Sequence, residues 1–319
     1  QLKDFGSGDR ASYPVRLLVD DGPAGEQLVD IPAGGEATAV FTHEFAAPGE
    51  HRVRAELPID ALETDNSRWL SVPVRPSMNV LVIRGKPGAG DHIAFSLGTG
   101  RPSEQIVRVD VASENALLER ELAEYDAVFL SNVARLGRDE AAVLHQYVKN
   151  GGGLIIVLGD QVNVESYNRE LFSGEDTPRL LPAELLEFSA VGDWRFDPRG
   201  YEHPLMDAFR GHGNTGLLTR PIWKYVKLQV PNDSEAKVAL WLDNGDPAIV
   251  EGSIGRGRVV VMATTASDHS KERTVNPPIN WSSLLSWPGL PPLIQEVFAL
   301  AASGKFDNRN VLVGQPIES

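Results

Sequence analysis

A few acidic and imidazole side chains in this sequence could carry acid–base chemistry. Asp160 ends the glycine-punctuated apolar stretch GGGLIIVLGD, and His203 and His269 are histidines that could pair with it. A carboxylate beside an imidazole can activate a water molecule, which is the chemistry of many hydrolases. The same turn also permits a structural interpretation, in which Asp160 and Asn163 accept hydrogen bonds from the backbone amides of their own turn. The sequence leaves both interpretations open.

Other short motifs point to metal or cofactor sites less directly. In IDALETDN, the oxygens of Asp60, Asp65 and Asn66 could bind calcium, although such residues more often cap loops. The loop Gly85–Gly90 reads G-x-x-G-x-G, which is neither the dinucleotide fingerprint nor a phosphate-binding loop, so we expect a connector. No histidine pair has the helical spacing of a zinc site such as H-E-x-x-H. We therefore expect no cofactor and no metal, with calcium at Asp60, Asp65 and Asn66 as the alternative.

The composition excludes several classes of function. The 319 residues carry a formal net charge of −14, and an acidic surface repels phosphate backbones, so we expect no nucleic-acid partner. The chain has no cysteine, which excludes disulfides, thiolate nucleophiles and cysteine-ligated zinc. Its longest apolar runs, LIIVL and VVVMA, are much shorter than the ~20 residues of a membrane helix. The chain begins at Gln1 with no signal-peptide pattern, and we expect it to be a piece of a longer protein.

Residues 1–75 have the pattern of an all-β domain. Short segments alternate apolar and polar residues, as in YPVRLLVD, ATAVFTHEF, HRVRAEL and RWLSVPV. Turns rich in glycine and proline separate them, which together predicts a β-sandwich. The tail, residues 305–319, contains NVLVGQPI, which we expect to be a strand that completes this domain or begins another.

Residues 76–304 have the pattern of an α/β domain. Continuous apolar strands (MNVLVI, QIVRVDV, DAVFLSN and GLIIVLG) alternate with helical segments (DHIAFSLG, SENALLERELAEY and LGRDEAAVLHQYVKNGG). This alternation predicts a mostly parallel, doubly wound sheet with helices on both faces. Later strands, ALWL, AIVEGS and VVVMAT, are joined by the turns DNGD and IGRGR and are expected to form hairpins. LPPLIQEVFALAASG is expected to be a terminal helix that packs over Trp281 and Trp287.

A parallel sheet brings the residues that follow its strands to one edge, where ligands bind. The residues expected at this edge are Gly85–Gly90, Asn132, Asp160, Gln161, Asn163 and Thr264–His269, a range that includes Asp268. His203, which precedes a proline in YEHPL, is expected to hold a loop over the same edge. We therefore expect any ligand pocket of the chain to lie there.

The α/β segment resembles the class I glutamine amidotransferase-like fold through YDAVFLSN, YVKNGGGLIIVLG, HPL and IGRGRVVVMAT. The first domain, with IPAGGEATAVFTHEF, PGEHRVRAEL and DALETDNSRW, resembles the Ig-like adhesion modules (CARDB type) of bacterial cell-surface proteins. The combination is similar to the extracytoplasmic part of membrane-anchored bacterial proteins of the Bat-type, von Willebrand factor A-associated group. The resemblance implies an Ig-like domain over residues 1–75 and an amidotransferase-like domain over residues 76–304.

At the catalytic positions of that family the chain departs from the pattern. The family's Gly-x-Cys-x-Gly elbow is LGDQV here, with Asp160 or Gln161 near the place of the cysteine. Its Gly-Gly oxyanion turn is SNV, and its His-Pro-Glu motif is replaced by His269 and Glu272 at a different distance from the last core strand. Because no side chain at the elbow can form a thioester, we expect no amidotransferase activity.

These observations lead to two hypotheses about function. The first is a non-enzymatic module that recognises other proteins of a membrane-associated complex in the periplasm or cell envelope, on an amidotransferase-like scaffold whose catalytic parts are lost. The second is a hydrolase or small-ligand-binding protein that uses Asp160, His203 and His269 at the edge of the sheet. It requires these three side chains to converge on one concave pocket.

Overall fold

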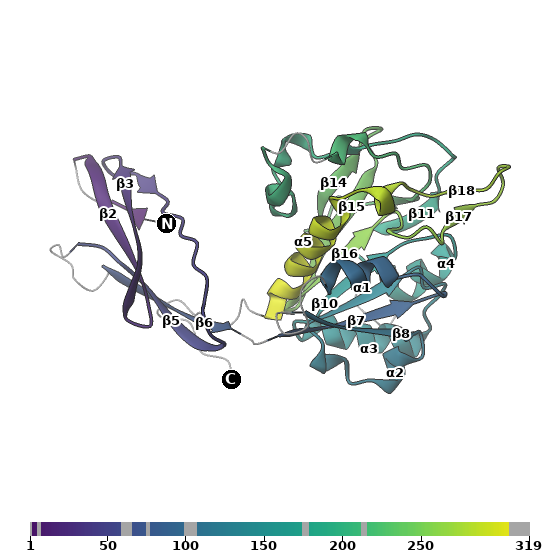
Figure 1. Ribbon diagram of the computed structural model, residues 1–319, viewed down its shortest axis with the longest axis horizontal. Coiled ribbons are helices and arrows are strands. Elements are labelled where there is room, and N and C mark those ends of the chain that lie inside the picture. The colour runs from purple at the N-terminus through teal and green to yellow at the C-terminus, as the bar shows by residue number, and fades with distance from the viewer. Residues whose placement is uncertain are drawn as a thin grey trace. The chain divides into compact units, whose positions relative to one another are not determined.

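The computed structural model describes residues 2–4, 8–58, 66–74, 77–98, 107–173, 179–211 and 216–305. The chain divides into two compact units, which we call unit 1 (Gln1–Pro76 with Arg309–Ser319) and unit 2 (Ser77–Asn308). Figure 1 shows the elements of each unit. No helix in the described residues is long and apolar enough to cross a lipid bilayer.

Unit 1 consists of antiparallel strands. Four of them form a sheet in the order β3-β2-β5-β6, and β1 pairs with β4. Their bounds are β1 Leu2–Lys3, β2 Arg10–Val19, β3 Gly22–Ile31, β4 Glu36–Ala37, β5 Gly49–Glu56 and β6 Ser67–Val74. The buried core is small and centres on Val15, Val29 and Ile31. The Ig-like sandwich expected over residues 1–75 stays a prediction.

The prediction of one strand in unit 1 is wrong. In ATAVFTHEF only the first alanine belongs to a strand, and residues 38–45 form none. The alternation does put one face on the core, since Ala39 and Phe41 pack against it while Val40 is 75% exposed, but the stretch joins no backbone ladder. A side-chain hydrogen bond holds this stretch instead, with the Val40 amide donating to Gln27 Oε1 over 3.0 Å.

Unit 2 is built on an eight-stranded mixed sheet in the order β12-β14-β15-β16-β10-β9-β7-β8. The pairings from β16 to β8 are parallel, and those from β16 to β12 are antiparallel. The strands of this sheet are β7 Met78–Arg84, β8 Val107–Ser113, β9 Ala127–Ser131, β10 Gly153–Val157, β12 Phe196–Asp197, β14 Lys237–Leu242, β15 Pro247–Ile254 and β16 Gly257–Met262. Two small pairs lie outside it: β11 Glu184–Phe188 with β13 Val226–Gln229, and β17 Lys271–Glu272 with β18 Ile279–Asn280. The expected hairpins β14-β15-β16 are confirmed.

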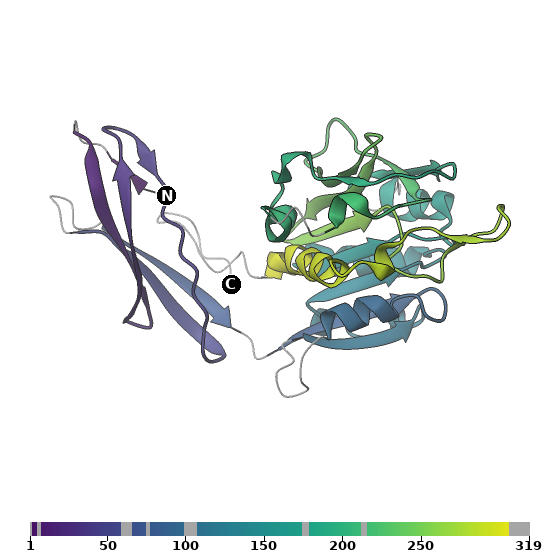
Figure 2. The same cartoon turned by 45° about the horizontal axis from the view of Figure 1, so that its top comes forward.

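Helices cover both faces of this sheet. The α-helices are α1 Asp91–Leu97, α2 Ala116–Glu119, α3 Arg138–Lys149, α4 Val164–Tyr167 and α5 Leu290–Ala302. α1 and α5 lie side by side on one face in Figures 1 and 2, and α2 and α3 lie on the other. The central strands of the sheet are mostly apolar and buried, because helices cover them on both faces. The expected α/β fold with a mostly parallel, doubly wound sheet is confirmed.

The helix expected over SENALLERELAEY is broken. It consists of α2 and a separate 3₁₀ turn, Leu122–Glu124, because Arg120 between them has an extended backbone. The Arg120 guanidinium turns instead to Asp110 Oδ2 at 2.8 Å and to the Tyr125 hydroxyl at 2.6 Å.

The order of the strands places a topological switch at β7. The chain crosses from β7 to β8 on one side and later returns to β9 on the other side of β7. The loops that follow β7 and β9 therefore diverge, and the space between such loops is where open α/β sheets bind ligands.

Candidate functional site

Asn132 closes the space between the ends of three parallel strands. It follows β9 in a left-handed conformation (φ 51°) and is 2% exposed. A Cβ atom on Gly85, after β7, would stand 2.0 Å from the Asn132 carbonyl oxygen, and one on Gly159, after β10, would stand 2.5 Å from Asn132 Cγ. Glycine is thus required at both neighbouring turns, because the Asn132 residue fills the room that a side chain would need.

The side chain of Asp160 is held by three neighbouring segments. Its Oδ1 atom accepts from Lys86 Nζ at 2.6 Å and from Asn132 Nδ2 at 2.8 Å, and its Oδ2 atom accepts from the Lys271 amide at 3.3 Å. Burial alone raises the pKa of the Asp160 carboxyl, but these hydrogen bonds outweigh burial and hold the pKa below its usual value. Asp160 is therefore an ionised anchor, and no histidine of the described residues bonds to it.

The other residues of this turn have mainly structural contacts. The Gln161 amide donates to Asn132 Oδ1 at 2.9 Å, while the Gln161 side chain is exposed. Asn163 caps α4, because its Oδ1 atom accepts from the Ser166 amide at 2.8 Å. The structural interpretation thus describes Asn163. Asp160 differs from that interpretation, since its partners Lys86, Asn132 and Lys271 come from other segments of the chain.

His269 lies near this edge but forms no catalytic relay. Its ring packs directly on Gly88 of the loop after β7. Its Nδ1 atom is 2.9 Å from Asp268 Oδ1 and 3.2 Å from Ser267 Oγ. A serine–histidine–acid relay uses the two ring nitrogens separately, one for each partner. Because both neighbours share Nδ1 here, the His269 ring cannot pass a proton from the serine toward the acid.

His203 lies in a different cluster, on the antiparallel side of the sheet. Its Nδ1 atom accepts from the Leu205 amide at 3.2 Å, so Nε2 carries the proton and donates to Glu251 Oε1 at 3.1 Å. Arg258 contacts the other oxygen of Glu251, also at 3.1 Å. Burial raises the pKa of Glu251, but His203 and then Arg258 lower it further than burial raises it. Both nitrogens of His203 are therefore in use, and the expected convergence of Asp160, His203 and His269 does not occur.

A pocket of about 470 Å³ opens beside Asp160 at the carboxyl edge of the sheet. The residues that line it carry a net positive charge. The lining residues are Lys86, Asp160, Gln161, Phe188, Lys224, Lys271, Glu272, Arg273 and Trp281. Four cationic and two anionic side chains leave a formal charge of +2 (four minus two) in a chain whose own formal charge is −14.

The two carboxylates of this pocket are already neutralised. Asp160 is paired with Lys86, as described above, and Glu272 is paired with Lys224. The hydrogen bond from Lys224 lowers the pKa of Glu272 to about 2, with a further contribution from Thr274. Among the described residues, the Lys271 ammonium has only a neutral acceptor, Asn280 Oδ1, at 2.5 Å. Arg273 is exposed and forms no ion pair within the described residues.

An aromatic pair forms the apolar wall of the pocket. The rings of Phe188 and Trp281 meet edge to face, with centroids 5.6 Å apart. Phe188 is 37% exposed, whereas Trp281 is 2% exposed and its indole nitrogen has no hydrogen-bond partner among the described residues. Trp287, by contrast, is buried and stacks on Phe209, with ring centroids 5.8 Å apart.

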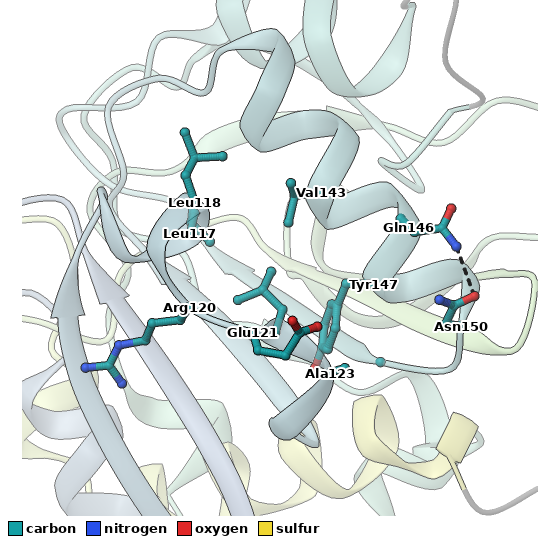
Figure 3. Close-up of a pocket in the computed structure, with 11 residues that line it drawn as sticks. Leu117, Leu118, Arg120, Glu121, Ala123, Val143, Gln146, Tyr147 and Asn150 are labelled. Carbon is teal, nitrogen blue, oxygen red and sulfur yellow. Dashed lines mark hydrogen bonds between the residues drawn. The ribbon is translucent and has the colours of Figure 1, made fainter.

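A second hollow, of about 380 Å³, lies between α2 and α3. Figure 3 shows leucine and valine side chains around it, Arg120 pointing away from it, and the hydrogen bond from Gln146 to Asn150 at its rim. Arg120 is committed to Asp110 and Tyr125, as described above. This hollow thus lacks the cluster of charged groups found at the carboxyl edge.

The calcium candidates gain no support. Asp60 and Asp65 lie outside the described residues, and Asn66 is buried with its carbonyl accepting from the Leu57 amide at 2.8 Å. Within the described ranges, no group of three or more acidic or histidine side chains is arranged to hold a metal ion.

The sequence did not identify most of the pocket. Lys86 belongs to the loop Gly85–Gly90, which we expected to be only a connector, and Lys271 and Arg273 lie just beyond the expected edge segment Thr264–His269. Basic residues in segments that follow parallel strands were the signal available. Lys224 had no such signal, since it comes from the irregular region before β13.

Comparison with solved structures identifies the fold of unit 2. Two cytoplasmic proteins from Salmonella typhimurium match 70% of this chain, each with a TM-score of 0.50, at 18% and 17% identity over 98% and 99% of their own lengths. The likeness shows the fold alone. It is the amidotransferase-like α/β fold that the resemblance implied.

A protein from Parabacteroides merdae described as ThuA-like matches 76% of the chain and 96% of its own length, with a TM-score of 0.46 and 16% identity. No protein-family model and no curated protein matches the sequence. None of these comparisons concerns the Ig-like module or the Bat-type group, which stay predictions.

Proposed function

We propose that unit 2 is a non-enzymatic ligand-binding module, which binds a small molecule in the pocket at the carboxyl edge of its sheet. The proposal rests mainly on Asp160, the one carboxylate at the elbow. Its oxygens accept hydrogen bonds from Lys86, Asn132 and the Lys271 amide, so the side chain has a structural role. The elbow has no nucleophile, and neither His203 nor His269 is arranged to activate water. A pocket of about 470 Å³ is within the range that small-molecule sites occupy, roughly 300–1,000 Å³.

The experiment separates binding from turnover. The purified chain is incubated with a defined mixture of metabolites, washed by ultrafiltration and denatured, and the released compounds are identified by mass spectrometry. We expect one compound to be retained unchanged in stoichiometric amount. Hydrolysis of glutamine, an ester or any mixture component that is lost in a folded Asp160→Asn variant would show that the chain is an enzyme and would overturn the proposal.

A role in protein recognition is a second candidate, and unit 1 supports it. Its four-stranded sheet has β3 and β6 as edge strands among the described residues, and Leu28 on β3 and Trp69 on β6 are 59% and 54% exposed. Exposed edge strands with apolar side chains readily pair with partner chains. A photo-crosslinking residue at position 69 should capture one discrete partner in cells, and a matched label at Arg138 of unit 2 should not capture it.

The cellular location belongs to the same proposal. The resemblance to envelope modules supports a place outside the cytoplasm as part of a membrane-anchored longer chain, and the lack of cysteine is compatible with it. Antibody detection in fractionated source cells tests this, and recovery only in the cytosolic fraction would contradict it.

A further inference from the structure

We infer that the ligand of this pocket is a small organic anion, with a carboxylate or phosphate group bound by Lys271 and Arg273 and an apolar or planar body lying against Phe188 and Trp281. The inference rests on the proposed binding function and specifies its ligand. It starts from the charge of the lining, which is positive although the chain as a whole is strongly acidic. A local positive field in a concave site concentrates anions.

The pairing inside the pocket shows which cations remain for a ligand. Lys86 and Lys224 are neutralised by carboxylates, at Asp160 and Glu272. Lys271 and Arg273 both line the pocket, in and directly after β17, and neither side chain has an acidic partner in the described part of the chain. A guanidinium and an ammonium together match an oxyanion, since each supplies charge-assisted N–H donors.

The aromatic wall specifies the rest of the ligand. Phe188 is 37% exposed and offers an accessible ring, and its partner Trp281 is almost fully buried, with an indole N–H that no described residue accepts. A buried donor without an acceptor is destabilising, so a ligand oxygen that reached it would gain a hydrogen bond. An anion with an attached ring or hydrocarbon body fits this lining better than a bare inorganic ion.

The test uses the full chain and four probes: phenyl phosphate, benzoate, inorganic phosphate and neutral benzyl alcohol. Binding is measured by titration calorimetry and by tryptophan fluorescence at low and moderate salt. We expect phenyl phosphate or benzoate to bind more tightly than inorganic phosphate, benzyl alcohol not to bind, and affinity to fall as salt rises. Trp281→Phe should abolish the fluorescence change.

Variants locate the site. Lys271→Gln and Arg273→Gln should each weaken binding of the anionic aromatic probe about tenfold, which is the loss of roughly one charge-assisted hydrogen bond. The matched control is Arg169→Gln, which removes an equally positive but 68% exposed side chain that does not line the pocket. The control should bind like the unaltered chain, and circular dichroism checks that all variants are folded.

Three results would overturn the inference: no binding of either anionic aromatic probe up to 10 mM (about the millimolar limit of weak binding), equal binding of benzyl alcohol, or anion binding that Lys271→Gln and Arg273→Gln leave unchanged. In each case retention of an uncharged metabolite in the ultrafiltration experiment would leave the proposed binding function intact. Turnover in that experiment would instead remove the proposed function itself.

Discussion

Replacing Asp160 by alanine tests whether this carboxylate anchors the carboxyl edge of the sheet. The change removes a 2.6 Å ion pair with Lys86 and the hydrogen bonds to Asn132 and the Lys271 amide. Breaking a fully buried ion pair costs about 3–5 kcal/mol. Because the side chains of Lys86 and Asp160 are each 16% exposed, water screens part of this cost, and we expect a loss of about 2 kcal/mol in the free energy of unfolding.

Urea unfolding monitored by tryptophan fluorescence measures this loss, since five of the six tryptophans belong to unit 2 and Trp69 alone to unit 1. The matched control is Glu187→Ala, which removes an ion pair to Lys227 of the same 2.6 Å length but with the carboxylate 67% exposed. The control should leave the midpoint unchanged. If Asp160→Ala shifts the midpoint no further than the control does, the carboxylate is no anchor and the reasoning is refuted.

The pH dependence of the same pair has a defined sign. The pKa of Asp160 is lower in the folded chain than in the unfolded chain, so its contribution to stability is complete above the unfolded value, near 3.9, and is lost as pH falls through the folded value. The difference in stability between the unaltered chain and Asp160→Asn should therefore shrink as the solution is acidified below about pH 4. A difference that grows on acidification would contradict the assignment.

Three further changes give separate tests. Gly159→Ala should destabilise unit 2 by about 1–3 kcal/mol in thermal unfolding, because its Cβ would stand 2.5 Å from Asn132 Cγ, and a second change of Asn132→Gly should recover part of the loss. The ion pair between Glu272 and Lys224 should stabilise the fold fully above pH 4.5, the ordinary pKa of the carboxyl, and should be lost as pH falls toward about 2. Glu272→Gln should remove this loss of stability on acidification, and melting temperatures at pH 3 and pH 6 measure it. His203→Ala should cost about 1–2 kcal/mol by leaving the buried carboxylate on β15 with one partner fewer, yet should not change the affinity for phenyl phosphate; a change in affinity would place His203 in the binding site.

The strands of unit 2 were predictable because their signal is local. MNVLVI and GLIIVLG are near-continuous apolar runs of strand length, which are typical of strands covered on both faces. Once the strands were placed, the edge that collects Asn132 and Asp160 followed from the rule for parallel sheets. The break at Arg120 was not predictable in the same way, since the partner that draws it out of the helix, Asp110, lies on β8.

The partners of the site residues could not be derived from sequence, because they depend on contacts between distant segments. His203 and Glu251 are 48 residues apart, and Lys86 and Asp160 are 74 residues apart. No periodicity relates such positions. The alternation in ATAVFTHEF misled for a different reason: Ala39 and Phe41 pack on the core as the pattern predicts, but residues 38–45 join no backbone ladder, which the alternation alone does not reveal.

The hydrogen bond from the Gln161 amide to Asn132 Oδ1 has a consequence for protein engineering. Acyl-transfer chemistry needs free N–H groups that await the charge developing on the substrate oxygen. In this chain the Gln161 amide already donates to the Asn132 side chain. A thiol introduced at position 161 would therefore have no free N–H at this turn to stabilise the substrate oxygen. Installing acyl-transfer chemistry here would require replacing Asn132 as well as introducing a thiol.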